Sequence, residues 1–361
     1  MVVHSSALTS WQTFRQTFDQ KLQENLQRLQ QELPLQEDPF IQEIFEHILP
    51  LAEQGKRVRP YIASVLFEAA GGNPEDQPWD AWIGLELIHL FALIHDDIID
   101  HGLQRHSVET MQTFVARRLR EQERNGNHVN VSESQAILAG DLTYTWALQE
   151  LTKASQSSAN SSAVSRIVFE LLREVILGQA LDVDLTTRPP ASYEMIEKKM
   201  LLKTARYTFT RPMQLGAALG TTNNASNLFT FCQEFGDKLG LAFQLQDDWF
   251  DILAAEQRTG KTGYRDLEEA QQTFFTCFVF THGTLAQQER LSRLLGHPLT
   301  KEEQEAAYTL FTEVDAMKHG ERLIEKYYLD AERILNEGSP LPEKSRQTLQ
   351  AFVTFLRTRS A

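Results

Sequence analysis

Two short stretches of the sequence place aspartates at the end of an apolar run: LIHDDIID, which ends at Asp100, and QLQDDWFD, which ends at Asp251. Positions four apart share one face of an α-helix, so Asp96 projects beside Asp100 and Asp247 beside Asp251. Carboxylates are rarely buried unless they are paired or bind a metal. Carboxylate oxygens suit magnesium, which prefers a few carboxylates together with substrate phosphates.

The simpler alternative for each stretch is a solvated acidic face on a helix surface. Each cluster, however, ends a strongly apolar run, LELIHLFALIH in the first case and LGLAFQLQ in the second. An apolar helix that becomes acidic at its end is typical of a helix that borders a cavity. We therefore expect two such helices to face each other and to hold magnesium ions between them.

Basic residues complement the first acidic cluster. GKRVRP is predicted to open a helix, and Lys56 and Arg59 are three positions apart. A lysine and an arginine together suit a diphosphate, because one supplies a point charge and the other a bidentate fork. His89 lies two helical turns before Asp96 on the same stripe. A solvated basic turn and an ordinary core histidine are the alternatives for these residues when each is taken alone.

Polar and basic residues also accompany the second cluster. Lys203 and Thr204 end the stretch KKMLLKT, Gln244 lies one helical turn before Asp247, and Lys261 lies in the loop TGKTG. Together these residues predict a pocket for a substrate that carries one or two diphosphates and an apolar tail.

Helical periodicity dominates the elements that must position these residues, and no segment shows convincing strand alternation. The expected helices cover residues 11–33, 37–53, 57–70, 78–103, 108–123, 132–154, 161–181, 192–219, 224–256, 265–283, 285–295, 301–318, 318–337 and 341–359. Turn-forming stretches such as GGNPEDQP and QSSANSS separate them, and none is a clear domain linker. The sequence therefore predicts one all-α domain.

The bulk composition limits the class of protein. The chain has 361 residues, of which 42% are apolar, and its net charge of −14 argues against a nucleic-acid partner. We expect no membrane span and no signal peptide, because no apolar run is long enough and the N-terminus lacks the pattern. The two cysteines, Cys232 and Cys277, form no metal or disulfide pattern, which favours a reducing cytoplasmic setting.

The motifs GKRVRP, LELIHLFALIHDDIID, KT, LAFQLQDDWFD and GK, in this order and spacing, resemble the trans-isoprenyl diphosphate synthases, or polyprenyl synthetases. AGDLTYTWALQEL, GQALDVDL and KTARYTFTRPMQLGAALG agree with the same family. Each motif alone is weak, but the ordered set is specific. The resemblance extends from about residue 45 to the C-terminus. We expect residues 1–35 to form an amphipathic helix packed on the core and residues 36–361 to form the catalytic domain.

The resemblance implies a large helical bundle around a central cavity, the isoprenoid synthase fold, usually as a homodimer. It implies a prenyltransferase that condenses isopentenyl diphosphate with an allylic diphosphate and uses three Mg²⁺ ions bound by the aspartates of both clusters. By resemblance, the allylic diphosphate would contact Arg105, Lys203, Thr204, Gln244 and Lys261, and isopentenyl diphosphate would contact Lys56, Arg59 and His89. Asp96, Asp100, Lys203 and Asp247 would be the catalytic residues.

Two positions depart from the family pattern. His106 replaces the second arginine after the first cluster, and Gln271 replaces a lysine after the second. Both changes remove positive charge from the diphosphate region, and they favour the alternative of a terpene cyclase on the same fold. The basic residues for isopentenyl diphosphate and the second DDxxD motif favour the condensing enzyme. A non-catalytic subunit or a helical scaffold is less compatible with two intact aspartate clusters.

The residues before the first cluster bear on product length. Phe91 lies five residues before Asp96, about 7.5 Å deeper along the helix, and Ala92 lies next to it. A large ring below a small residue is expected to act as the floor of the tail pocket. This favours geranylgeranyl diphosphate (C20) as the product, followed by farnesyl diphosphate (C15). The alternative is that Phe91 is an ordinary core residue.

Overall fold

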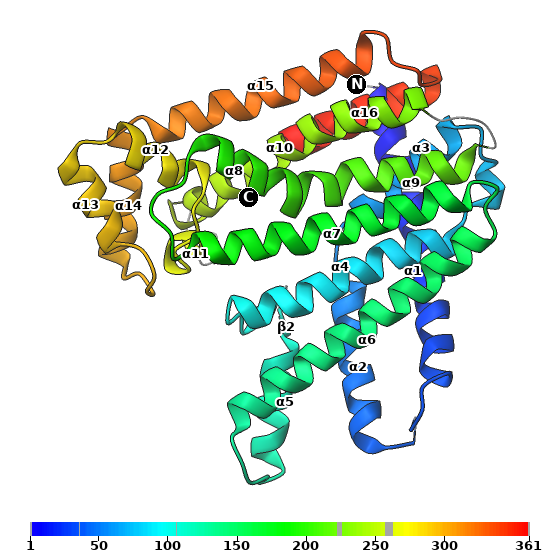
Figure 1. Cartoon of the computed structure of the whole chain (residues 1–361), viewed down its shortest axis with the longest axis horizontal. Coiled ribbons are helices and arrows are strands. Elements are labelled where there is room, and N and C mark those ends of the chain that lie inside the picture. The colour runs from blue at the N-terminus through cyan, green and yellow to red at the C-terminus, as the bar shows by residue number, and fades with distance from the viewer. Residues whose placement is uncertain (1, 36, 106, 222–225, 257–262, 360–361) are drawn as a thin grey trace. The chain divides into compact units, whose positions relative to one another are not determined.

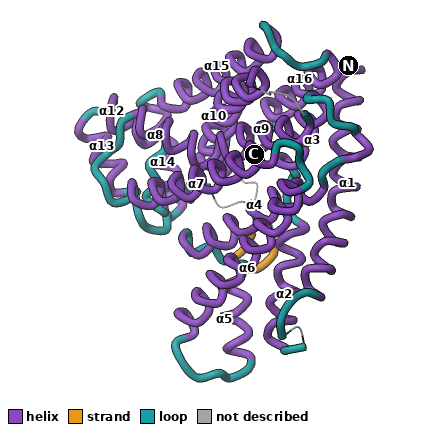
Figure 2. Tube along the Cα trace, turned by 45° about the vertical axis from the view of Figure 1, so that its right-hand side comes forward, coloured by secondary structure: helices purple, strands orange, loops and turns teal. Residues whose placement is uncertain are grey.

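The computed structural model describes residues 2–35, 37–105, 107–221, 226–256 and 263–359. Helices form almost all of this part of the chain, as the sequence predicts (Figures 1 and 2). One short antiparallel strand pair occurs within it, β1 (Gln104–Arg105) with β2 (Val108–Glu109). No helix within the described residues combines the length and the apolar composition needed to cross a membrane.

The helices before residue 166 are α1 (Val2–Gln31), α2 (Pro39–Glu53), α3 (Val58–Ala69), α4 (Trp79–Ile99), α5 (Met111–Glu121), α6 (His128–Gln156) and α7 (Ser161–Leu185), which continues beyond it. The later helices are α8 (Tyr193–Met200), α9 (Arg211–Gly220), α10 (Ser226–Glu256), α11 (Arg265–Glu268), α12 (Phe274–His282), α13 (Leu285–Arg293), α14 (Lys301–Glu313), α15 (Ala316–Asn336) and α16 (Glu343–Thr358). A 3₁₀ turn covers Pro74–Asp76, and Leu201–Thr210 is π-helical.

The predicted helix over 265–283 is wrong in one respect, because the structure divides it into α11 and α12. Ala270 has a φ of 53°, in the left-handed region that an α-helix cannot continue through. Thr273 then caps α12, and its side chain accepts a hydrogen bond from the backbone N–H of Thr276. Thr276 returns the bond, which completes a capping box.

The π-helical segment Leu201–Thr210 joins α8 to α9 in one continuous helical stretch. The N–H of Arg211 bonds to the carbonyl of Arg206, five residues back, which widens the turn. Pro212 follows directly, and a proline ring clashes with the carbonyl four residues before it in a regular α-helix. A widened turn relieves this clash, and π-helical turns are frequent at functional sites.

The helices form two compact units, each with its own core. The N-terminal unit comprises Leu8–Ser64 and Gly72–Ser165, and the C-terminal unit comprises Val65–Gly71 and Arg166–Ala361, together with Met1–Ala7.

In the N-terminal unit, α4 packs along α6. Gly84 makes this close packing possible, because a Cβ there would lie 2.6 Å from the Leu151 side chain. Helix α1 buries an apolar stripe in the same unit, formed by Phe18, Leu22, Leu26 and Leu29. These four positions recur every three or four residues, as expected for one face of a helix.

In the C-terminal unit, α10 packs against the π-helical segment, α9 and α15. Two glycines allow very close approach to the π-helical segment. A Cβ on Gly240 of α10 would lie 2.3 Å from the Cα of Ala205, and a Cβ on Gly178 of α7 would lie 2.4 Å from the backbone nitrogen of Lys203. These contacts fix the backbone that carries Lys203 and Thr204.

Candidate active site

The first aspartate cluster lies at the C-terminal end of α4. Asp96 is half-buried, Asp97 is buried, and Asp100 is the residue that ends the helix, its N–H bonded to the carbonyl of Asp96. Arg105 on β1 forms a bidentate ion pair with Asp97. Its Nη2 donates to Oδ1 at 2.8 Å, and its Nε donates to Oδ2 at 3.0 Å. Its Nη2 also lies 3.6 Å from Oδ2 of Asp96. The structure thus places Arg105 directly beside the cluster.

The basic residues predicted for isopentenyl diphosphate belong to the same unit. Lys56 is exposed and lies just before α3, Arg59 is half-buried in its first turn, and His89 is half-buried on α4. Arg57, which lies between Lys56 and Arg59 in the sequence, has a structural role that the sequence did not reveal. Its side chain is 1% exposed, and its guanidinium nitrogen Nη1 lies 2.7 Å from Oε1 of Glu86.

The predicted chain-length residues lie on α4 before the aspartates. Phe91 and Ala92 are both half-buried. The Phe91 ring lies 4.7 Å from the His95 ring and 4.9 Å from the Tyr144 ring of α6, measured between centroids. Phe91 therefore makes aromatic contacts with one residue of its own helix and with one residue of α6.

The second aspartate cluster lies in the last turns of α10. Asp247 is partly exposed, with 42% of its side chain accessible, whereas Asp248 is buried. Gln244 donates from Nε2 to Oδ1 of Asp248 at 2.6 Å and accepts a hydrogen bond from the Thr204 hydroxyl, also at 2.6 Å. The structure thus brings together Thr204 and Gln244, which the sequence predicts on separate elements.

Burial and a further carboxylate control the charge of this cluster. Burial, with Asp266 as the next contributor, raises the pKa of Asp248 to about 8. The same two causes raise the pKa of Asp251 well above its usual value, although its carboxylate accepts the backbone N–H groups of Arg265 and Asp266 at 3.3 Å. The sequence analysis did not single out Asp266, which lies in α11. A cation bound beside these carboxylates would relieve the repulsion between them and favour their charged forms.

Lys203 lies in a buried charge network that the sequence did not predict. Its Nζ lies 2.5 Å from Oδ2 of Asp182 on α7, and Nζ of Lys199 lies 2.7 Å from Oδ1. Burial alone would raise the pKa of Asp182, but Lys199 and Lys203 outweigh it and lower the pKa below its usual value. The Gln271 amide, with its nitrogen toward Asp182, donates to Oδ1 at 2.7 Å. Asp182 thus accepts a hydrogen bond from the neutral Gln271 amide, and Lys199 is the second cation, besides Lys203, that pairs with it.

Two sequence predictions cannot be placed, because Lys261 and His106 lie outside the described residues.

Asp96 and Asp247 suit magnesium by their chemistry, since both are hard oxygen donors with part of the side chain exposed, 27% and 42% respectively. Asp96 and Asp247 already lie next to cationic guanidinium groups, of Arg105 and Arg359 respectively. Among the described residues, no group of three or more His, Cys, Asp or Glu side chains is arranged to hold a metal alone. Magnesium commonly binds one or two carboxylates together with substrate phosphates, and this donor set fits that pattern.

Comparison with known proteins identifies the family. The model of the polyprenyl synthetase family matches residues 38–311. A geranylgeranyl diphosphate synthase of Methanosarcina mazei is 29% identical over 295 residues, covering 81% of this chain and 82% of that protein. A (2E,6E)-farnesyl diphosphate synthase of Mycobacterium bovis is 30% identical over 230 residues, covering 63% of this chain and 58% of that protein.

A solved structure is similar over nearly the whole chain. It is the geranylgeranyl pyrophosphate synthase of Corynebacterium glutamicum complexed with isoprenyl diphosphate and magnesium, with a TM-score of 0.88, 25% identity, and coverage of 96% of this chain and 98% of that one. These relatives are diphosphate synthases, which supports a condensing enzyme over the terpene cyclase alternative. The chain therefore belongs to the polyprenyl synthetase family and is a prenyltransferase of the trans-isoprenyl diphosphate synthase type.

Proposed function

We propose that this enzyme condenses isopentenyl diphosphate with an allylic diphosphate and makes geranylgeranyl diphosphate as its main product, with farnesyl diphosphate as the second candidate. The observation that supports the proposal is the hydrogen-bonded chain from Thr204 through Gln244 to Asp248 of the DDxxD motif of α10, with Lys203 next to Thr204 in the sequence. The relatives named geranylgeranyl diphosphate synthase support the choice of product.

In the proposed reaction, the bond between the allylic carbon and the diphosphate oxygen breaks, and the electron pair leaves with the diphosphate. When bound, magnesium ions neutralise the departing diphosphate; we expect three, held through Asp96, Asp100, Asp247 and Asp251. Lys203 and Arg105 add fixed positive charge, and Thr204 and Gln244 orient the substrate through hydrogen bonds. Lys261 is proposed as a further phosphate contact.

The second substrate completes the reaction. Lys56, Arg59 and His89 are proposed to bind the diphosphate of isopentenyl diphosphate, whose double bond attacks the allylic cation. A proton then leaves the new chain, and the released diphosphate accepts it. The apolar surface of α4 before Asp96 excludes water, which would otherwise capture the cation.

Chain length is proposed to depend on Phe91, with Ala92 leaving room above it. The ring packs against His95 and Tyr144, so it cannot swing aside without losing two aromatic contacts. A fixed ring at this depth would stop the growing tail at an intermediate length.

We propose that the enzyme is a homodimer, because α7 carries an apolar stripe that its own unit leaves uncovered. Phe169 and Ile176 are 60% and 48% exposed, and Val183 is 41% exposed. These residues are seven positions apart, so they line one face of the helix, with Leu177 beside them at 61%. Exposed apolar surface of this kind commonly marks a protein interface.

Light scattering would test the dimer with Leu177→Lys, which should give a monomer. Leu285→Lys is the matched control, since Leu285 is 79% exposed on α13, away from this stripe in sequence. A dimer that persists in Leu177→Lys would contradict the assignment of this face.

We also propose a cytoplasmic location. Cys232 and Cys277 are both free thiols in the buried core. Free thiols are typical of proteins in reducing compartments, where disulfides rarely persist.

The function is tested by incubating the purified enzyme with magnesium, isopentenyl diphosphate and one of dimethylallyl, geranyl or farnesyl diphosphate. Products are treated with phosphatase and identified by mass spectrometry. We expect a C20 alcohol, its loss in EDTA and its return when magnesium is added in excess. Hydrocarbons formed without isopentenyl diphosphate would instead establish the cyclase alternative.

Asp100→Asn should reduce kcat by at least about a hundredfold, because it removes a proposed metal ligand. Glu121→Gln is the control, since Glu121 is 59% exposed on α5 of the same unit and pairs with Arg117 at the surface. Equal activity of the two variants would contradict the role of the first cluster.

A further inference from the structure

The end of the chain contacts a proposed metal ligand. Arg359, which follows α16, extends its side chain along α10, and Nη2 lies 2.6 Å from Oδ1 of Asp247. The Arg359 side chain is 8% exposed, whereas that of Asp247 is 42% exposed. A nearly buried guanidinium therefore presents its charge to a carboxylate that reaches solvent.

Contacts that do not involve Asp247 hold this guanidinium in place. Nε donates to Oε1 of Gln246 at 3.0 Å, and Nη2 donates to the carbonyl of Phe243 at 2.9 Å. The guanidinium carbon also lies 4.0 Å from the centre of the Phe243 ring and 5.4 Å from that of Phe250. These residues and Asp247 occupy positions i, i+3, i+4 and i+7 of α10, which form one helix face.

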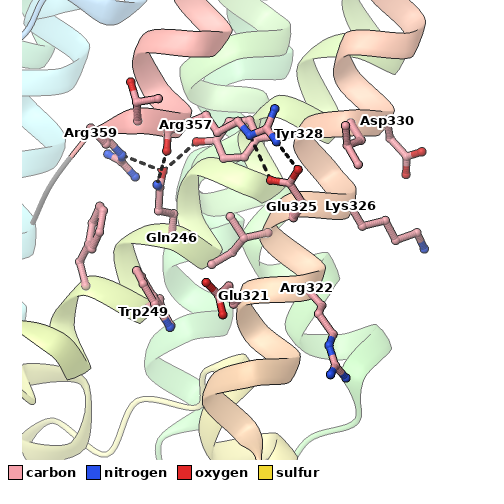
Figure 3. A pocket seen from close by; sticks show the side chains of 14 residues that line it. Gln246, Trp249, Glu321, Arg322, Glu325, Lys326, Tyr328, Asp330, Arg357 and Arg359 are labelled. Atoms are coloured by element: carbon pink, nitrogen blue, oxygen red, sulfur yellow. Dashed lines mark hydrogen bonds and ion pairs between the residues drawn. The ribbon is translucent and has the colours of Figure 1, made fainter.

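Gln246 is itself fixed from two further elements. Its Oε1 accepts the Tyr328 hydroxyl of α15 at 2.8 Å, and its Nε2 donates to the carbonyl of Arg357 at 3.2 Å. Figure 3 shows Gln246 linked to Tyr328, Arg357 and Arg359 beside a cavity of about 860 Å³. The helices α10, α15 and α16 thus lock the Arg359 guanidinium in one position.

We infer that Arg359 is a positioning residue that orients the metal ligand Asp247. This inference rests on the proposed function, in which Asp247 binds magnesium. The bond to Oδ1 fixes the rotation of the carboxylate and directs the Oδ2 atom away from Arg359, as the oxygen offered to the metal. Hydrogen-bond partners of metal ligands act in this way, and losing one typically weakens metal affinity about 10-fold to 100-fold.

The Arg359 guanidinium could have the opposite effect and compete with the metal for Asp247. A guanidinium repels a metal ion and could take its place beside the carboxylate. The geometry favours positioning. The guanidinium keeps its hydrogen bonds to Gln246 and Phe243 whether or not Asp247 binds a metal. These bonds hold it in the same position in both states. A carboxylate has two oxygens and can serve both partners at once.

The test measures Mn²⁺ binding by electron paramagnetic resonance with inorganic diphosphate present, so that no turnover is needed. Arg359→Met keeps much of the apolar stem but removes the fork, and we expect its Kd for Mn²⁺ to rise about 10-fold or more. Arg359→Lys should be intermediate, because lysine supplies charge without the planar fork. Arg357→Met is the matched control, since the Arg357 side chain pairs with Glu325 and Glu332 rather than with α10, and its Kd should stay within about twofold.

Asp247→Asn separates this inference from the proposed function. If Asp247→Asn leaves Mn²⁺ affinity unchanged, Asp247 is not a metal ligand and the proposed function fails at this residue. If Asp247→Asn weakens binding but Arg359→Met does not, or strengthens it, the positioning role is wrong. In the Asp247→Asn background, Arg359→Met should have no further effect on Kd; an additional loss would indicate a general structural role. Should Arg359→Met fail to fold, the comparison of Arg359→Lys with Arg357→Met decides.

Discussion

Removal of Asp182 should destabilise the enzyme strongly, because this one carboxylate neutralises two lysines. Asp182 is 3% exposed and binds Nζ of Lys203 at 2.5 Å and Nζ of Lys199 at 2.7 Å. Removing one partner of a buried ion pair typically costs about 3–5 kcal/mol. Asp182→Asn should fall at the lower end, about 3 kcal/mol, because the amide still accepts a hydrogen bond and the Lys203 side chain is 30% exposed.

Urea denaturation at pH 7 measures this loss as the difference in the free energy of unfolding. Asp184→Asn is the control, because Asp184 lies on the same helix, is 48% exposed, and pairs with Arg188 at the surface. Its free energy of unfolding should change by less than about 0.5 kcal/mol. If Asp182→Asn loses no more than Asp184→Asn, the buried network does not stabilise the fold as we argue.

The pH dependence gives a second check. The two lysines lower the pKa of Asp182 in the folded state, so its carboxylate stabilises the fold above the unfolded pKa of about 3.9. This contribution is lost only as the pH falls through the lower, folded pKa. The stability difference between wild type and Asp182→Asn should therefore stay constant from about pH 8 to 5. A difference that shrinks within this range would refute the assigned pKa direction.

Three further predictions follow from other parts of the molecule. Burial lowers the pKa of His47, so the wild type should lose stability as the pH falls below about 6.5, and His47→Gln should remove this component in urea titrations at pH 7.5 and 5.5. Gly178→Ala should cost about 1–3 kcal/mol and raise KM for the allylic substrate, because the new Cβ would push the Lys203 backbone, and unchanged kinetics would contradict this. Phe91→Ala should lengthen the products seen by mass spectrometry, and an unchanged profile would exclude Phe91 as the floor.

The sequence alone was enough to predict the all-α fold and most helix positions. Helix formation depends on local periodicity, and the apolar stripes of this chain repeat at helical spacing. The same periodicity placed Asp96 with Asp100 and Asp247 with Asp251 on shared faces. The break at Ala270 was missed because alanine favours helices, and only the surrounding packing imposes a left-handed backbone there.

Only the tertiary structure decided which distant charges meet. No local pattern joins Asp182 to Lys199 and Lys203, or Arg57 to Glu86, because the partners lie on elements that are well separated in the sequence. Gln271 looked like a simple loss of charge in the sequence, yet the fold places it on Asp182 beside Lys199. Arg359 meets Asp247 only because α16 packs in the same unit as α10. Periodicity determines which face of a helix a residue occupies, but long-range packing determines what that face meets.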